Sequence, residues 1–137
     1  MGAGFILYKE NPLEIFTLIP VDKKFNYDLP KGTEDPGETR LETAVRECFE
    51  ESGIQVPVDI IESIIEVDSG RLTVYIAPWQ KDWVPNIQPN PETQKEEHSD
   101  YVWITPEEFQ RSCAKWLKEA PYKFRVWYNK KAISLFK

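Results

Sequence analysis

Short apolar segments and one amphipathic segment alternate along the N-terminal half of the chain. Residues 4–8 and 14–19 are rich in β-branched and aromatic side chains and are separated by a polar turn at residues 9–12, so they predict two paired strands. From residue 39 to residue 52 the apolar positions recur at steps of three and four, which predicts an amphipathic helix. Gly53 then provides a C-terminal stop for that helix.

The next part of the chain predicts a hairpin followed by a long loop. Residues 59–67 and 71–79 are apolar runs, and Asp68-Ser69-Gly70 between them is typical of a tight hairpin turn. Residues 80–99 are mostly polar and contain several prolines, so they predict a loop. Loops of this length within a compact domain are often functional.

The C-terminal segment predicts one more strand and then helices. Residues 101–104 have the composition of a strand, and Thr105 followed by Pro106 is typical of a helix N-cap and first helical position. The remaining residues predict two helical pieces that break near Pro121.

Length and charge restrict the class of protein. A chain of 137 residues, 41% of them apolar, predicts a single domain over residues 1–137 with a real core. We expect a cytoplasmic protein, because no apolar run approaches the roughly 20 residues needed to cross a membrane. The net charge of −6 argues against binding to long nucleic acid. A small anionic substrate would need local bases or bound cations.

The residue types available for chemistry point to carboxylates. Cys48 and Cys113 lie far apart with no metal-binding spacing, so we expect reduced thiols. His98 is the only histidine, which excludes a multi-histidine metal site.

Acidic residues of the predicted helix share one face. On an α-helix Glu47, Glu50 and Glu51 fall within an arc of roughly 100°. The apolar residues of the helix take the adjoining arc and predict that it packs on a sheet: Leu41, Ala44, Val45, Cys48 and Phe49. Three carboxylates at this spacing repel one another. Mg²⁺ would compensate, because it takes carboxylate and phosphate oxygens together and activates water.

A solvated acidic helix face is the alternative interpretation. It does not explain why Gly32, the Pro36-Gly37 turn, Arg46 and Gly53 stand at fixed distances from the carboxylates. In this spacing the segment from Gly32 to Ile54 resembles the box of the Nudix hydrolase family, without gap or shift. The matching residues are Gly32, Glu38, Arg46, Glu47, Glu50, Glu51 and Gly53.

The resemblance implies both a fold and a reaction. The fold would be an α/β/α sandwich with a mixed β-sheet and a loop-helix-loop motif, which agrees with the order of predicted elements. Glu47, Glu50 and Glu51 would bind Mg²⁺, or Mn²⁺ as a substitute, with a backbone carbonyl from the Gly32 region, and Arg46 would pair with Glu38. The reaction would be attack of water on a phosphorus of a nucleoside diphosphate linked to another group.

Two segments outside the box resemble one subgroup, the asymmetric diadenosine tetraphosphate hydrolases. They are Tyr27-Asp28-Leu29-Pro30-Lys31-Gly32 and Glu97-His98-Ser99-Asp100-Tyr101-Val102-Trp103. By this resemblance Lys31 would contact phosphate, Tyr101 would stack on a base and Glu97 would assist the metal or the water. Tyr27 and His98 are further expected substrate contacts.

Alternatives remain open for both the residues and the substrate. Tyr101 could be a core residue, and Glu97 and His98 could be ordinary loop residues. Other substrates within the family are 5′-triphosphorylated RNA, ADP-ribose and nucleoside triphosphates. A nucleotide sensor without turnover is an alternative of another class, and the chain is expected to be a monomer or a homodimer.

Overall fold

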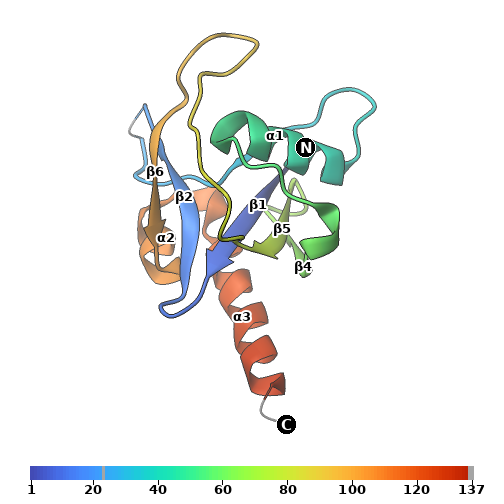
Figure 1. The fold of residues 1–137 in the computed structure, drawn as a ribbon, viewed down its shortest axis with the longest axis vertical. Helices are drawn as coiled ribbons and strands as arrows, with labels where there is room; N and C mark the ends of the chain where they lie inside the picture. The colour runs from blue at the N-terminus through green and yellow to red at the C-terminus, as the bar shows by residue number, and fades with distance from the viewer. Residues whose placement is uncertain (23, 136–137) are drawn as a thin grey trace.

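One mixed sheet with helices on both faces forms the body of the protein (Figure 1). The computed structural model describes residues 1–22 and 24–135. The strands are β1 (Gly2–Lys9), β2 (Glu14–Pro20), β3 (Lys31–Thr33), β4 (Ser63–Val67), β5 (Leu72–Pro78) and β6 (His98–Ile104). The helices are α1 (Arg40–Ser52), α2 (Pro106–Ser112) and α3 (Glu119–Ser134), with short 3₁₀ turns at Val58–Ile60 and Lys115–Leu117.

The strand order is β4-β5-β1-β2-β6, and β3 pairs with β1. β1 and β5 run parallel, whereas β1–β2, β1–β3, β2–β6 and β4–β5 are antiparallel. A parallel pair needs a long crossover connection, and here α1 lies within it. The expectation of a mixed sheet is confirmed.

The alternation of side chains along β1 divides the core into two layers. Phe5 and Leu7 lie in the cluster beneath α1, which also contains Ala44 and Cys48 of that helix. Ile6 and Tyr8 point to the opposite face and join a cluster with residues of α2 and α3. Helices therefore cover both faces, and the predicted α/β/α sandwich is confirmed.

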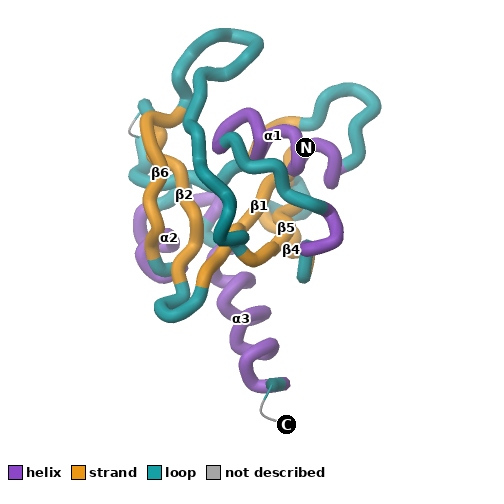
Figure 2. Tube along the Cα trace, viewed as in Figure 1, coloured by secondary structure: helices purple, strands orange, loops and turns teal. Residues whose placement is uncertain are grey.

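The long connection between β5 and β6 runs over the α1 side of the sheet and projects beyond the end of the strands (Figure 2). It is tied to the body early, because the amide of Asn86 donates to the carbonyl of Ser52 at the end of α1 over 2.7 Å. No helix of the described ranges is long and apolar enough to cross a membrane.

Four expectations about the elements need correction. Residues 59–67 were expected to be one strand, but the first part forms a 3₁₀ turn and the strand starts at Ser63. β6 starts at His98 rather than at residue 101, because β2 pairs with it as far as Pro20↔His98. β3 was not predicted.

The fourth correction concerns the helices. Their break lies at residues 113–118, and Pro121 is the third residue of α3. Proline is tolerated there because the amides of a first helical turn have no partner within the helix.

Candidate active site

α1 is fixed at both ends by residues of the box. Thr39 caps its N-terminus and forms a capping box with Glu42, which satisfies two otherwise unpaired amides. Gly53 ends the helix in the left-handed conformation with φ of 76°, a geometry that glycine adopts without strain. The carboxylates of α1 therefore project from a rigid support.

The three carboxylates of α1 differ in burial because they lie at different angles from its apolar face. Glu51 is nearest the core, and burial raises its pKa well above the ordinary value. Burial also raises the pKa of Glu47, whose side chain is 16% exposed, and Glu50 is the outermost at 26%. Phe49, expected on the inner face, is 51% exposed because it lies at the edge of the apolar arc.

β3 brings the backbone of Lys31 and Gly32 directly against α1. A Cβ atom at Gly32 would overlap the carboxyl group of Glu47, so any larger residue would displace that carboxyl group. The amide of Lys31 donates to Oε1 of Glu51 over 2.9 Å. The backbone of Gly32 therefore lies beside the carboxylates with which it was expected to share a metal ion.

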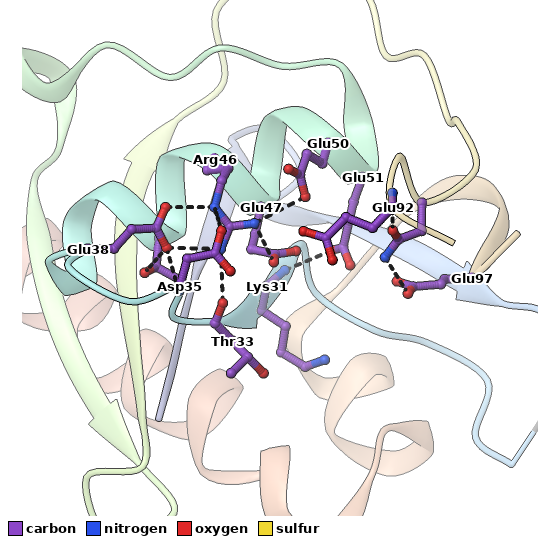
Figure 3. A network of polar contacts seen from close by, with 12 residues as sticks. Lys31, Thr33, Asp35, Glu38, Arg46, Glu47, Glu50, Glu51, Glu92 and Glu97 are labelled. Carbon is purple, nitrogen blue, oxygen red and sulfur yellow. Dashed lines mark hydrogen bonds and ion pairs between the residues drawn. The ribbon is translucent and has the colours of Figure 1, made fainter. Parts of the chain in front are cut away.

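Arg46 is the counter-charge of a carboxylate cluster that consists of Glu38, Glu47 and Glu50 (Figure 3). It donates to both oxygens of Glu38 at 2.7 and 3.0 Å, so the expected ion pair is present in the structure. It also reaches Glu47 at 2.9 Å and Glu50 at 3.2 Å. The hydrogen bonds from Arg46 hold the pKa of Glu38 down at about 2, and Glu38 in turn raises the pKa of Arg46.

A second group of site residues comes from the end of the long loop and the start of β6. One ligand atom each from Glu51, Glu97 and His98 lies within 4.8 Å of the others. Glu97 is exposed and accepts a hydrogen bond from the side-chain amide of Asn90 over 2.9 Å. Segments almost fifty residues apart in sequence thus bring oxygen and nitrogen atoms that could bind a metal ion into one small volume.

Asp28 is a site residue that the sequence interpretation missed. Its carboxylate contacts Nε2 of His98 at 3.1 Å and Nζ of Lys31 at 3.1 Å. Burial alone would raise the pKa of Asp28, but the hydrogen bond to His98 and the charge of Lys31 outweigh it and lower this pKa. The only available signal was an acidic residue between Tyr27 and Leu29.

The carboxylates of α1, Arg46, Asp28, Glu97 and His98 line one cleft of about 710 Å³, whereas Glu38 lies outside its lining. Nine acidic and three basic side chains line it within the described ranges. A polyphosphate could enter such a surface only together with cations, because carboxylates accept hydrogen bonds and repel phosphate. The donor set fits hard divalent ions, which prefer carboxylate and carbonyl oxygens.

Two of the expected substrate contacts, Tyr27 and Tyr101, are not among the residues that line this cleft, whereas Lys31 and His98 are. Tyr27 packs against the cluster under α2 and α3, near Glu108. Tyr101 is 38% exposed on the α1 side of the sheet and stacks on Phe16 at 5.6 Å. The side chain of Lys31 lines the cleft but points away from the α1 carboxylates.

The fold and the site together define a Nudix hydrolase. The family model described as NUDIX domain matches residues 4–127, so the chain belongs to this family and is a pyrophosphohydrolase.

The chain is 32% identical over 122 residues to the asymmetrical bis(5′-nucleosyl)-tetraphosphatase of Mus musculus, and the match covers 78% of this chain and 80% of that protein.

Solved structures agree with the fold. A C. elegans Ap4A hydrolase binary complex has a TM-score of 0.72 and 18% identity, covering 95% of this chain and 99% of that chain. The Nudix hydrolase RenU of M. smegmatis has a TM-score of 0.69 and 15% identity, covering 94% and 85%. At these identities the structural likeness shows the fold alone.

Proposed function

We propose that the protein is a Mg²⁺-dependent hydrolase of dinucleoside polyphosphates, with diadenosine tetraphosphate as its substrate. The observation that supports this most is the group of Glu47, Glu50, Glu51 and Glu97 at one strongly acidic cleft. The identity to the mouse tetraphosphatase supports the choice of substrate.

Within this proposal the metal ligands are Glu47, Glu50 and Glu51 from α1, Glu97 from the loop and a backbone carbonyl near Gly32. Bound Mg²⁺ supplies positive charge toward phosphate oxygens and lowers the pKa of water. Mn²⁺ would serve as a substitute.

The protein side chains supply orientation. Arg46 fixes Glu47 and Glu50 through one guanidinium group, and Glu38 fixes Arg46 from the other side with two hydrogen bonds. The Glu97 carboxylate is exposed beside the more buried Glu51, and in this proposal it would accept a proton from the attacking water.

Aromatic residues near β6 would bind a base. Tyr101 stacks on Phe16 and is 38% exposed to solvent. Stacking of a base on an aromatic ring contributes about 1–3 kcal/mol. Tyr101 therefore keeps the proposed role although it lies beyond the carboxylate cleft.

A substrate panel tests the proposal. Purified protein with Mg²⁺ is given diadenosine tetraphosphate, ADP-ribose, nucleoside triphosphates and 5′-triphosphorylated RNA, and the products are separated by ion-exchange chromatography. Asymmetric cleavage of the tetraphosphate gives one triphosphate and one monophosphate. A higher kcat/KM on another panel member would reject the proposed substrate, and nucleotide binding without any turnover would favour a sensor.

A pair of variants on one helix tests the site. Glu50→Gln is expected to abolish Mg²⁺-dependent turnover while the circular dichroism spectrum stays unchanged. Glu42→Gln is the matched control, because glutamine also completes a capping box and Glu42 lies outside the cleft lining. An undiminished rate in Glu50→Gln would reject the metal assignment.

A further inference from the structure

Asp28 is a buried carboxylate in the wall of the cleft. It is 6% exposed, less than any other acidic residue among the described residues. Removing a carboxylate from water costs several kcal/mol unless its partners compensate. Its backbone is fixed as well, through two hydrogen bonds with Leu18 of 2.8 Å each. The position of this carboxylate is therefore rigid, and its side-chain partners explain its presence.

Those partners are both site residues. One carboxylate oxygen contacts Nε2 of His98, and the ammonium of Lys31 lies 3.1 Å from the other. An ionised carboxylate can only accept hydrogen bonds, so Nε2 of His98 must carry the proton that is shared. Asp28 thus fixes both the position and the protonated nitrogen of the imidazole ring.

His98 directly follows Glu97, at the junction between the exposed loop and β6. The backbone support here is incomplete, because the pairing of β2 with β6 shifts register between Ile19 and Pro20. Within the described part of the chain β6 is also an edge strand, which pairs with β2 alone. The carbonyl of Glu97 accepts one backbone hydrogen bond here, from the amide of Val21 over 3.0 Å. The side-chain link from Asp28 to His98 adds a second attachment at this irregular end of the sheet.

We propose that Asp28 is a positioning residue that holds the Glu97 carboxylate beside Glu51 by anchoring His98. The inference deepens the proposed function, because it concerns how that same metal site is assembled. Removing a residue that orients a metal ligand without binding the metal itself typically lowers metal affinity or activity by about 10- to 100-fold.

The test combines Asp28→Asn, Glu97→Gln and the double variant. Asparagine has the same shape, but its NH₂ group must face N–H donors on either side: the backbone amide of Leu29 or Nε2 of His98, with the Lys31 ammonium near both. Asp28→Asn is expected to lower kcat for diadenosine tetraphosphate about 10- to 100-fold and to weaken Mn²⁺ binding, measured by electron paramagnetic resonance without substrate. In the Glu97→Gln background the same change is expected to have no further effect on either quantity.

Variants of His98 give a second route if Asp28→Asn folds poorly. His98→Gln retains an N–H donor and is expected to preserve more of the Mn²⁺ affinity than His98→Leu. Because His98 is the only histidine, its ring nitrogens give an unambiguous NMR signal. A protonated Nε2 is expected in the wild-type protein, and Asp28→Asn is expected to shift this signal.

Glu62→Gln is the matched control. It removes a carboxylate that pairs with Lys131 at 2.8 Å outside the cleft, so the melting temperature is expected to fall with kcat unchanged.

The inference would be overturned if Asp28→Asn kept the kcat and the Mn²⁺ affinity of the wild-type protein. It would also be overturned if Asp28→Asn lowered these two quantities by the same factor in the wild-type and in the Glu97→Gln backgrounds. An inactive wild-type protein would instead reject the proposed function, while Mn²⁺ binding and the His98 signal would still report on the anchor.

Discussion

Replacing Arg46 by glutamine removes the positive charge that the carboxylate cluster shares. The side chain donates two hydrogen bonds to Glu38 and one each to Glu47, Glu50 and the carbonyl of Thr33. Glutamine can replace at most one or two of them. Three neighbouring carboxylates would then face one another without a counter-charge.

The expected loss of stability follows from these contacts. Hydrogen bonds to charged groups contribute about 1.5–3 kcal/mol when buried, and like charges one turn apart add a few tenths of a kcal/mol. The Arg46 side chain is 24% exposed and those of Glu38, Glu47 and Glu50 are 18%, 16% and 26% exposed, so we expect about 2–3 kcal/mol. An unfolding entropy of about 2.1 cal/mol/K per residue converts this into a melting temperature lower by roughly 7–10 °C.

The assay is thermal unfolding followed by circular dichroism, in EDTA and in saturating Mg²⁺. We expect more than half of the deficit to disappear with Mg²⁺, because the bound cation replaces the charge of the arginine. Arg40→Gln is the control on the same helix, since Arg40 binds Glu34 and Thr73 outside the carboxylate cluster. Its deficit is expected to be equal in both buffers.

Two results would refute this reasoning. A deficit of Arg46→Gln that is the same with EDTA and with Mg²⁺ would show that Arg46 is not the counter-charge of a metal site. A fall of less than about 3 °C would show that solvent screens the network far more than its burial indicates.

Three further predictions concern other parts of the structure. Gly32→Ala is expected to displace the Glu47 carboxyl group and lower kcat/KM about 100-fold, measured by steady-state kinetics; a normal rate would show that the site tolerates the extra methyl. Glu51→Gln is expected to raise the melting temperature in EDTA while abolishing turnover, because burial disfavours the charged carboxylate and raises its pKa; a lower melting temperature in EDTA would contradict this. Burial and the hydrogen bond to Glu62 raise the pKa of Tyr8 from 10.0 to about 12, so the unfolded chain loses this proton first. The contribution of Tyr8 to the free energy of unfolding is therefore fully present below pH 10 and is lost as the pH rises toward 12. In chemical denaturation, the free energy of unfolding of Tyr8→Phe should fall less steeply over this pH range than that of the wild-type protein.

The parts of the fold that the sequence predicted are those with local signals. α1 was expected from residue 39 to residue 52 and spans Arg40–Ser52, because its apolar period, its cap and its terminal glycine all lie within the segment. β1 and β2 were found for the same reason, since each is a short run rich in β-branched and aromatic residues.

The parts that were missed depend on contacts with distant segments. β3 contains three residues, Lys-Gly-Thr, and none of them favours a strand by itself. It is a strand because Gly2 and Gly4 of β1 leave space for its backbone to pair.

Asp28 and Tyr27 show why site residues outside the box were harder to predict. Successive side chains of an extended segment point to opposite sides. Asp28 therefore faces the cleft, whereas Tyr27 packs under the helices of the other layer. The resemblance pointed to the right segment, but only the direction of each side chain distinguishes the two roles.

The long loop is attached at both ends of its cleft-lining part, and this has a consequence for how substrate preference can change. Asn86 binds the end of α1, and the link to Asp28 holds His98 at the other end. Residues 87–96 between these attachments contribute Asn90, Glu92, Thr93, Lys95 and Glu96 to the wall of the cleft. Asn90 also binds Glu97, but the other residues of this stretch can be exchanged during evolution or by design without moving the proposed metal ligands, so that new specificities can arise on an unchanged frame.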